Sequence, residues 1–436
     1  MRYGPKTCNS NADLDPFSSR KVKETLLDNS VLILFIIICG IGLVYANQPG
    51  SYIVDQVVTR FFRNLVLVLS LLIPVWAGMG LNFSIVVGAM SAQAGLIMTL
   101  NYNITGINGI ASSFLFGAPI AVFLGILTGR LFNRTKGQEM ITGMILGYFA
   151  NGIYQLIFMY LCGPVIPIHN KSIMLNNGIG INGIVTFDQS LNGALDKLWK
   201  IPLDHALWLV IGIITVIYII NTLLSVKRNS MRLNAHPFIV PVILIMCSVA
   251  LYLCSKHYKA FITTCLFTKV PVATATISVM VCMLITFLGE TKLGSDIKTV
   301  GQSIPIASSS GIKVNKTRIV AIAISTLLAA LGQVIYLQNM GTLTTYSAAD
   351  QIGTFSVAAL LVGGASIKRA NIGQAILGTI LFHTMFVVAP IAGKNIFGDA
   401  QIGEYFRVFV SYAVIALALA LHAWKTLLVE KRNKKH

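Results

Sequence analysis

The residues of this chain that could do chemistry are mostly uncharged polar side chains embedded in apolar segments. Amide, hydroxyl and imidazole groups in such positions are suited to hydrogen-bonding a small solute, although each is more often an interhelical contact. We therefore treat them as candidates for a solute path, with His383 best explained by packing. The candidates are Asn82, Gln93, Tyr148, Asn151, Gln155, Gln333 and Gln374, with Tyr336 and His383 beside them.

Groups arranged for bond-making chemistry are not evident. The sequence has no G-x-x-x-x-G-K-[ST] phosphate loop, and the glycine-rich stretch from Gly363 to Lys368 has the wrong spacing for one. His169 and His205 stand far apart in sequence, and the seven cysteines form no C-x-x-C pair. We predict no catalytic residue, no metal site, no cofactor held by this chain, and no enzymatic activity of its own.

The composition identifies the environment in which these side chains lie. Hydrophobic residues make up 55% of the 436-residue chain and charged residues only 11%. Usage this apolar predicts an integral membrane protein. The net charge of +18 does not indicate nucleic-acid binding, because the basic residues are dispersed in short loops and not gathered on one surface.

Apolar segments long enough to cross a bilayer run through most of the chain. Spanning backbone must satisfy its own hydrogen bonds, so we predict an all-α polytopic bundle of about 10–12 transmembrane segments. Some segments are short enough to be re-entrant. The predicted segments are 30–46, 64–80, 86–103, 111–129, 139–162, 205–224, 237–254, 270–289, 319–337, 352–366, 371–390 and 406–424.

Loop charges predict the orientation of the bundle. About two-thirds of the lysines and arginines fall in segments on one side, which we assign to the cytoplasm with both termini. The N-terminal segment 1–28 and the basic tail 425–436 then flank a membrane domain, 29–424. The loop 163–204 faces outward, where it serves either as a docking surface or as a passive cap. The tail is suited to anionic membrane lipid.

The polar insert 290–318 is longer than a cytoplasmic turn between two helices requires. Leu293, Ile297, Val300 and Ile304 recur at spacings of three and four, which predicts a short amphipathic helix. Two roles fit the pattern equally well. The helix is either a docking element for a soluble partner or an interfacial helix that only stabilises the loop.

This insert resembles the cytoplasmic coupling loop of ABC importer permeases of the ribose, nucleoside and branched-chain amino acid type. Lys298-Thr299 stands where that family usually has Arg-Ala, and Gln302-Ser303 where it has Glu-Asn. The resemblance implies that this loop couples the permease to an ATPase. The residues that it assigns to coupling are Thr291, Gly294, Lys298, Val300, Gly301, Ala307, Gly311 and Ile312.

Three further stretches resemble the same family. Residues 138–150, QEMITGMILGYFA, are similar to a segment of the nucleoside branch, with Gly147 in place of an Asn. Residues 78–84, GMGLNFS, resemble a turn of the sugar permeases, and residues 363–367 resemble a glycine-rich turn. The glycines of 78–88 indicate either a broken helix beside a cavity or close helix packing.

The resemblance implies a transport subunit with several partners. These are a separate ATP-binding subunit, a second permease in a homo- or heterodimer, and an extracytoplasmic substrate-binding protein. The solute is expected to be a nucleoside or sugar-like, with a branched-chain amino acid or a vitamin as alternatives. A stand-alone secondary transporter is the runner-up, disfavoured because no Asp or Glu lies in the middle of a predicted span, where it could relay protons.

Overall fold

A computed structural model of the chain describes residues 30–187, 191–209, 211, 246, 259–347 and 349–433. These residues form mostly helices, and six of the helices are long and apolar enough to cross a membrane. The prediction of an all-α, multi-pass membrane protein is confirmed. The six candidate spans are Gly50–Trp76, Gly106–Arg134, Glu139–Leu161, Val272–Glu290, Val314–Met340 and Ile372–Phe397.

Ten of the twelve predicted segments coincide with described helices. The segments 205–224 and 237–254 lie almost entirely outside the described residues. The helices that correspond to the other segments are α2 (Ser30–Ala46), α3 (Gly50–Ser70) with α4 (Leu72–Trp76), α5 (Ile85–Asn101), α6 (Gly106–Arg134), α7 (Glu139–Leu156) with the π-helix η1 (Ile157–Leu161), α12 (Val272–Glu290), α15 (Val314–Met340), α16 (Asp350–Val362), α17 (Ile372–Phe397) and α18 (Ala400–Asn433).

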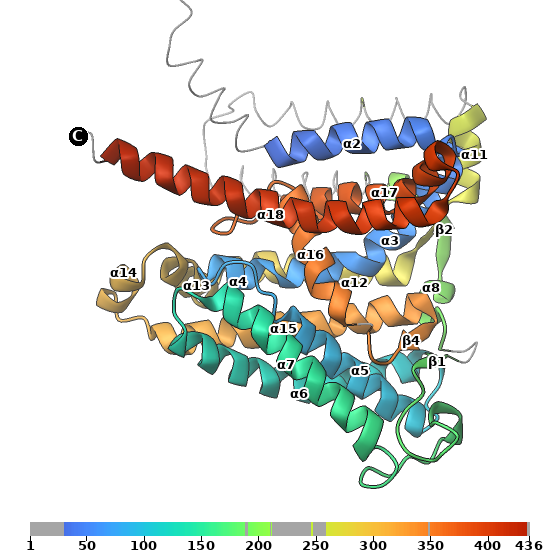
Figure 1. Ribbon diagram of the computed structural model, residues 1–436, viewed down its shortest axis with the longest axis horizontal. Coiled ribbons are helices and arrows are strands. Elements are labelled where there is room, and N and C mark those ends of the chain that lie inside the picture. The colour runs from blue at the N-terminus through green and yellow to red at the C-terminus, as the bar shows by residue number, and fades with distance from the viewer. Residues whose placement is uncertain are drawn as a thin grey trace, which may run out of the picture.

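The helices form two groups joined by a middle layer (Figure 1). In the first group α15 packs against α5 and α6, and in the second α17 packs against α18 and α2. Helix α3 contacts both α15 and α17, and α16 contacts α5 and α17. Side chains on α3, α15, α16 and α17 therefore meet between the two groups.

The start of one span differs from the prediction. The segment predicted at 64–80 begins at Gly50, because α3 continues through a half-polar stretch that hydropathy alone assigned to an outer loop. Arg60 and Arg63 consequently lie near the middle of the span Gly50–Trp76 and not outside it. The last helix, α18, continues through residue 424 to Asn433, and the assignment of 425–436 to a cytoplasmic tail stays a prediction.

The glycine-rich stretch 78–84 does interrupt the helix. Helix α4 ends at Trp76, and α5 begins at Ile85. Gly78 and Gly80 between them have φ of 71° and 72°, a left-handed conformation that side chains with a Cβ rarely adopt. Gly88 packs closely, since a Cβ there would lie 2.5 Å from the backbone oxygen of Thr326. The break in the helix and the close packing are therefore both present, whereas a cavity beside these glycines stays a prediction.

The two ends of the bundle are built differently (Figure 1). At one end, which we call the inner end from the predicted orientation, lie α13 (Lys292–Gln302) and α14 (Ile304–Ser309). At the outer end β1 (Ile184–Thr186) pairs antiparallel with β4 (Thr342–Thr344), and β2 (Lys200–Pro202) pairs with β3 (Lys269–Pro271). The loop 163–204 is therefore tied to the ends of the helices over its described part.

Candidate functional site

Helix α13 is fixed to the inner end of the bundle by its own sequence. Thr291 caps the helix, its hydroxyl accepting a hydrogen bond from the Gly294 amide at 3.3 Å. Ile297 and Val300 form the buried face. Lys298 donates from Nζ to the Gly289 carbonyl at 2.8 Å, with its ammonium 4.9 Å from the Trp76 ring centroid. The amphipathic helix predicted from the spacing of these residues is confirmed.

Glycines bring the backbone of α13 directly against that of the neighbouring helix ends. A Cβ on Gly301 would lie 2.0 Å from the Trp76 carbonyl oxygen, and a Cβ on Gly78 would lie 2.7 Å from the Gly301 Cα. Gly294 is equally constrained, with 1.9 Å to the Leu288 carbonyl oxygen. No side chain can be inserted at these contacts without moving backbone, so α13 and the end of α4 move together.

A second short helix follows α13 directly, where one helix was predicted. Ser303 ends α13 and caps α14, accepting a hydrogen bond from the Ile306 amide at 3.4 Å. Ala307 is buried in a small cluster with Val300, whereas Ile304 and Ile306 are 40% and 61% exposed. Helix α14 projects from the bundle at its inner end (Figure 1).

The eight residues assigned to coupling belong to this pair of helices and to the turn that follows it. Ile312 packs on the cluster of Val300 and Ala307, and Gly311 takes a φ of 79° in the turn. The structure brings the eight residues into one unit. Their contact with an ATPase stays a prediction, because no partner chain is present.

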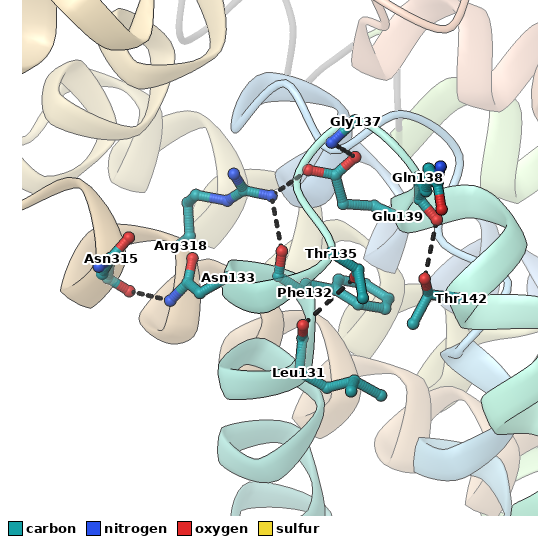
Figure 2. Close-up of polar contacts among 10 residues, drawn as sticks. All are labelled: Leu131, Phe132, Asn133, Thr135, Gly137, Gln138, Glu139, Thr142, Asn315 and Arg318. Atoms are coloured by element: carbon teal, nitrogen blue, oxygen red, sulfur yellow. Dashed lines mark hydrogen bonds and ion pairs between the residues drawn. The ribbon is translucent and has the colours of Figure 1, made fainter.

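A buried ion pair that was not predicted from the sequence lies at the inner end of the bundle, between Arg318 and Glu139. Arg318, 2% exposed, donates from Nη2 to a carboxylate oxygen of Glu139 (Figure 2). The same nitrogen lies 3.4 Å from the Phe132 carbonyl oxygen, and the other Glu139 oxygen accepts from the Gly137 amide at 2.9 Å. The pair joins the start of α15 to the end of α6 and the start of α7.

A nearby hydrogen bond supports the same junction. Asn133 donates from Nδ2 to the Asn315 carbonyl at 2.8 Å (Figure 2). The ion pair has only a weak signal in the sequence, since Glu139 is an acid at the start of an apolar segment and Arg318 a base at the start of another. Pairing them required knowing that α6, α7 and α15 converge.

The predicted solute-path residues divide into several environments. Asn82 is 2% exposed, and its Oδ1 accepts a hydrogen bond from the Ser84 amide at 3.0 Å. Gln93 and Gln333 are fully buried, and neither amide has a hydrogen-bond partner in the described structure. Buried amides usually are paired, so Gln93 and Gln333 stay candidates for contact with water or a solute.

The other predicted path residues lie nearer the surface. Tyr148 is 74% exposed on α7. Gln155 lies 3.4 Å from the Asn151 side-chain oxygen and 3.4 Å from the Tyr346 carbonyl oxygen. Gln374 closes a capping box at the start of α17 and donates to the Gly364 carbonyl at 2.9 Å. These contacts give Gln155 and Gln374 structural roles, and solute contact by all seven residues stays a prediction.

A cavity of about 390 Å³ lies between the two helix groups, toward the outer end. None of the seven residues lines it, but Tyr336 and His383 do. Its wall combines basic, aromatic and hydroxyl side chains from α3, β4 and α15 to α18. The lining residues are Arg60, Arg63, Asn64, Leu67, Val68, Tyr336, Leu337, Met340, Thr342, Thr344, Ser347, Gln351, Ile352, Phe355, Ser356, His383, Phe386 and Arg407.

The basic lining differs from the uncharged path that a low-dielectric bilayer favours. Arg63 donates to Asn339 Oδ1 at 3.2 Å and lies 5.1 Å from the Tyr336 ring centroid. Arg407 lies 4.0 Å from the Phe386 ring centroid and pairs with Glu404. Hydropathy analysis missed Arg60 and Arg63 because they precede the uncharged run that begins at residue 64.

Strand β4 and the turn after it contribute Thr342, Thr344 and Ser347 to the cavity wall. Tyr346 in that turn donates from its hydroxyl to the Ile181 carbonyl at 2.7 Å. Burial raises the pKa of the Tyr346 phenol, so it remains a donor throughout the physiological range. The hydrogen bond ties β4, and with it Thr342 and Thr344 of the cavity wall, to the loop 163–204.

Comparison with known proteins identifies the family. Residues 53–419 match the profile described as "Branched-chain amino acid transport system / permease component". No curated protein and no solved structure gives a significant match. The matched range contains the coupling helices, the buried ion pair and every lining residue of the cavity. The chain therefore belongs to the family of ABC transport-system permease components, as a multi-pass membrane subunit.

Proposed function

We propose that this subunit forms the membrane path of an ATP-driven importer for a nucleoside or sugar-like solute. The observation that carries the proposal is the inner-end unit of α13 and α14, which is rigidly fixed to the bundle on one side and exposes Ile304 and Ile306 on the other. Exposed apolar side chains on a projecting helix are suited to insertion into a groove of a partner. The partner is a separate ATP-binding subunit.

The geometry suggests how movement of the ATPase reaches the path. Displacement of α13 acts on α4 through the Gly78–Gly301 contact and on α15 through the turn 310–313. Arg318 and Glu139 carry the displacement of α15 to α6 and α7. Because packed interfaces switch between discrete arrangements and do not deform continuously, binding and release of the motor shift the helix groups as units.

The remaining partners follow from the family. A second permease subunit completes the membrane part, and an extracytoplasmic binding protein delivers the solute at the outer end, where the loop 163–204 receives it. The preference for a nucleoside or sugar rests on the sequence stretches 138–150 and 78–84, and aromatic and hydroxyl groups in the cavity wall suit such solutes. A branched-chain amino acid or a vitamin is the alternative.

The test uses the reconstituted complex of permease, ATPase and binding protein in liposomes. Solute-loaded binding protein should stimulate ATP hydrolysis, and uptake should require ATP. Ile306→Asp should abolish co-purification of the ATPase while leaving the permease folded, because Ile306 is 61% exposed. Lys136→Asp, at an exposed position of the same end, serves as the control and should retain the ATPase. Uptake by the permease alone, without nucleotide, would contradict the proposal.

A further inference from the structure

We propose that the outer cavity binds an acidic group, a carboxylate or a phosphate monoester, carried by the transported solute. This inference rests on the proposed transport function and adds to it the chemical class of the solute. The cavity wall contains Arg60, Arg63 and Arg407 but no aspartate or glutamate. A cavity of this size, about 390 Å³, lies within the range of small-molecule sites.

The charge of the wall is not balanced by the protein within the described residues. Arg407 pairs with Glu404, which leaves the charges of Arg60 and Arg63. Asp196 is linked to Arg63 only through Asn339. The Asn339 side chain accepts a hydrogen bond from Arg63 and donates one to Asp196 at 2.5 Å. That relay orients Arg63, but no carboxylate among the described residues forms an ion pair with its guanidinium or with that of Arg60. The cavity is therefore electropositive.

The position of these arginines in a membrane-spanning segment makes this imbalance informative. Both belong to the apolar segment Gly50–Trp76, and Arg63 reaches Asn339 and Met340 at the outer end of α15. Charged side chains within such segments are costly and therefore rare. A structural role would normally be served by an apolar residue or by a paired charge. Intramembrane cations without a counter-ion indicate a binding function, and an anionic ligand is the natural counter-ion.

The three guanidinium groups differ in how they are held. Aromatic rings lie beside two of them, Tyr336 beside Arg63 and Phe386 beside Arg407. Arg63 also donates to Asn339, and Arg407 pairs with Glu404. The Arg60 guanidinium has no hydrogen-bond partner among the described residues, which leaves its donors for the two oxygens of a carboxylate or phosphate.

The rest of the wall fits the neutral part of such a solute. His383 is 5% exposed, and its Nδ1 has no partner among the described residues. Thr342, Thr344 and Ser347 provide hydroxyl groups near the outer end, opposite the aromatic ring of Phe355. A ring with hydroxyl groups and one acidic substituent, such as a sugar acid, a sugar phosphate or a nucleoside monophosphate, matches this combination of groups.

The first test compares matched neutral and acidic compounds on the purified complex. Thermal unfolding is measured with uridine and uridine 5′-monophosphate, ribose and ribose 5-phosphate, and glucose and glucuronate, at equal ionic strength. At least one acidic compound should raise the Tm by several degrees where its neutral partner does not. The double variant Arg60→Gln/Arg63→Gln should remove the shift, and Arg134→Gln, an exposed arginine of the inner end, should retain it.

A second measurement does not depend on the identity of the solute. Ser347→Cys places a thiol in the cavity wall, where an anionic methanethiosulfonate should react at least tenfold faster than a cationic one after the rate of the parent chain is subtracted. The ratio should fall toward one in the background of Arg60→Gln/Arg63→Gln, because the two cations attract the anionic reagent.

Three results would overturn the proposal. The first is a Tm shift that is the same for neutral and acidic compounds, or absent for both. The second is a Tm shift by an acidic compound that persists in the double variant. The third is stabilisation by phosphatidylglycerol vesicles alone, which would assign the arginines to lipid binding. ATP-dependent uptake of a neutral solute alongside any of these results would leave the transport function intact. Loss of ATP-dependent uptake with the acid effect preserved would contradict only the transport function.

Discussion

The buried arginine at the inner end and the arginines of the outer cavity show two uses of one residue type. Arg318 has a carboxylate partner, Glu139, and a backbone carbonyl on the same nitrogen. Arg60 and Arg63 have no carboxylate partner among the described residues, although they also belong to a membrane-spanning segment. A cation with its counter-ion inside the fold holds helices together, whereas one without is available to a ligand. The difference is in the neighbours, so the residue type alone cannot assign the role.

The largest effect is expected from Arg318→Met. Removing the cation leaves the Glu139 carboxylate buried without a counter-ion, which costs about 3–5 kcal/mol of stability. Thermal or denaturant unfolding of the purified subunit measures this loss. Arg134→Met, at an exposed position of the same end, should change stability by less than about 0.5 kcal/mol. An equally small effect at Arg318 would show that the pair does not hold the helices.

The double variant Arg318→Met/Glu139→Met should recover most of that stability. Replacing both partners of a buried ion pair by apolar residues is often neutral, because no charge is left unpaired. Recovery to within about 1–2 kcal/mol of the parent chain is expected from the same unfolding measurement. The pair is also proposed to transmit displacement of α15 to α6 and α7. If it does, ATP-driven uptake should be reduced in the double variant. Full activity there would limit the pair to stability.

Arg63→Gln should have the opposite profile. Stability should change by no more than about 1 kcal/mol, since the lost hydrogen bond to Asn339 is offset by removal of an unbalanced buried charge. Uptake should fall by about tenfold, the equivalent of 1.4 kcal/mol, and unfolding and uptake are measured on the same preparation. A loss of stability as large as that of Arg318→Met would remove the distinction between the two regions.

Arg407→Gln should produce the smallest effect. This arginine already has a partner, Glu404, whose side chain is 46% exposed and can be solvated when the pair is lost. Partly exposed pairs contribute only about 0–1 kcal/mol, so stability should stay within that range. Uptake should fall less than in Arg63→Gln. A larger fall would show that Arg407 is the principal anion-binding residue.

The sequence predicted the helical membrane fold well because its main signal is the length of apolar runs. Ten predicted segments coincide with described helices, since a membrane tolerates little other than helix. The coupling helix was also predictable, because Ile297 and Val300 recur with the helical period and form its buried face. Its division into α13 and α14 was not, although Ser303 and Pro305 were visible as a cap and a first-turn proline.

The site at the outer end could not be predicted in the same way. Hydropathy assigned Arg60 and Arg63 to an outer loop because it measures only the mean polarity of a stretch of sequence. It contains no information on tertiary packing, and α3 with its two cations packs against α15 and α17. Gln374 was a candidate for solute contact and instead caps a helix. Contacts between residues far apart in the sequence, such as Arg318 with Glu139, have no local signature.

The contact between Gly78 and Gly301 joins the end of α4 to helix α13 through backbone atoms, with no flexible side chain to absorb a displacement. Helix α3, which leads into α4, carries Arg60 and Arg63. If an ATPase displaces α13 as proposed, the resulting tilt of α3 moves both cations relative to the opposite cavity wall. The same movement would then change the shape of the cavity and the binding of the solute.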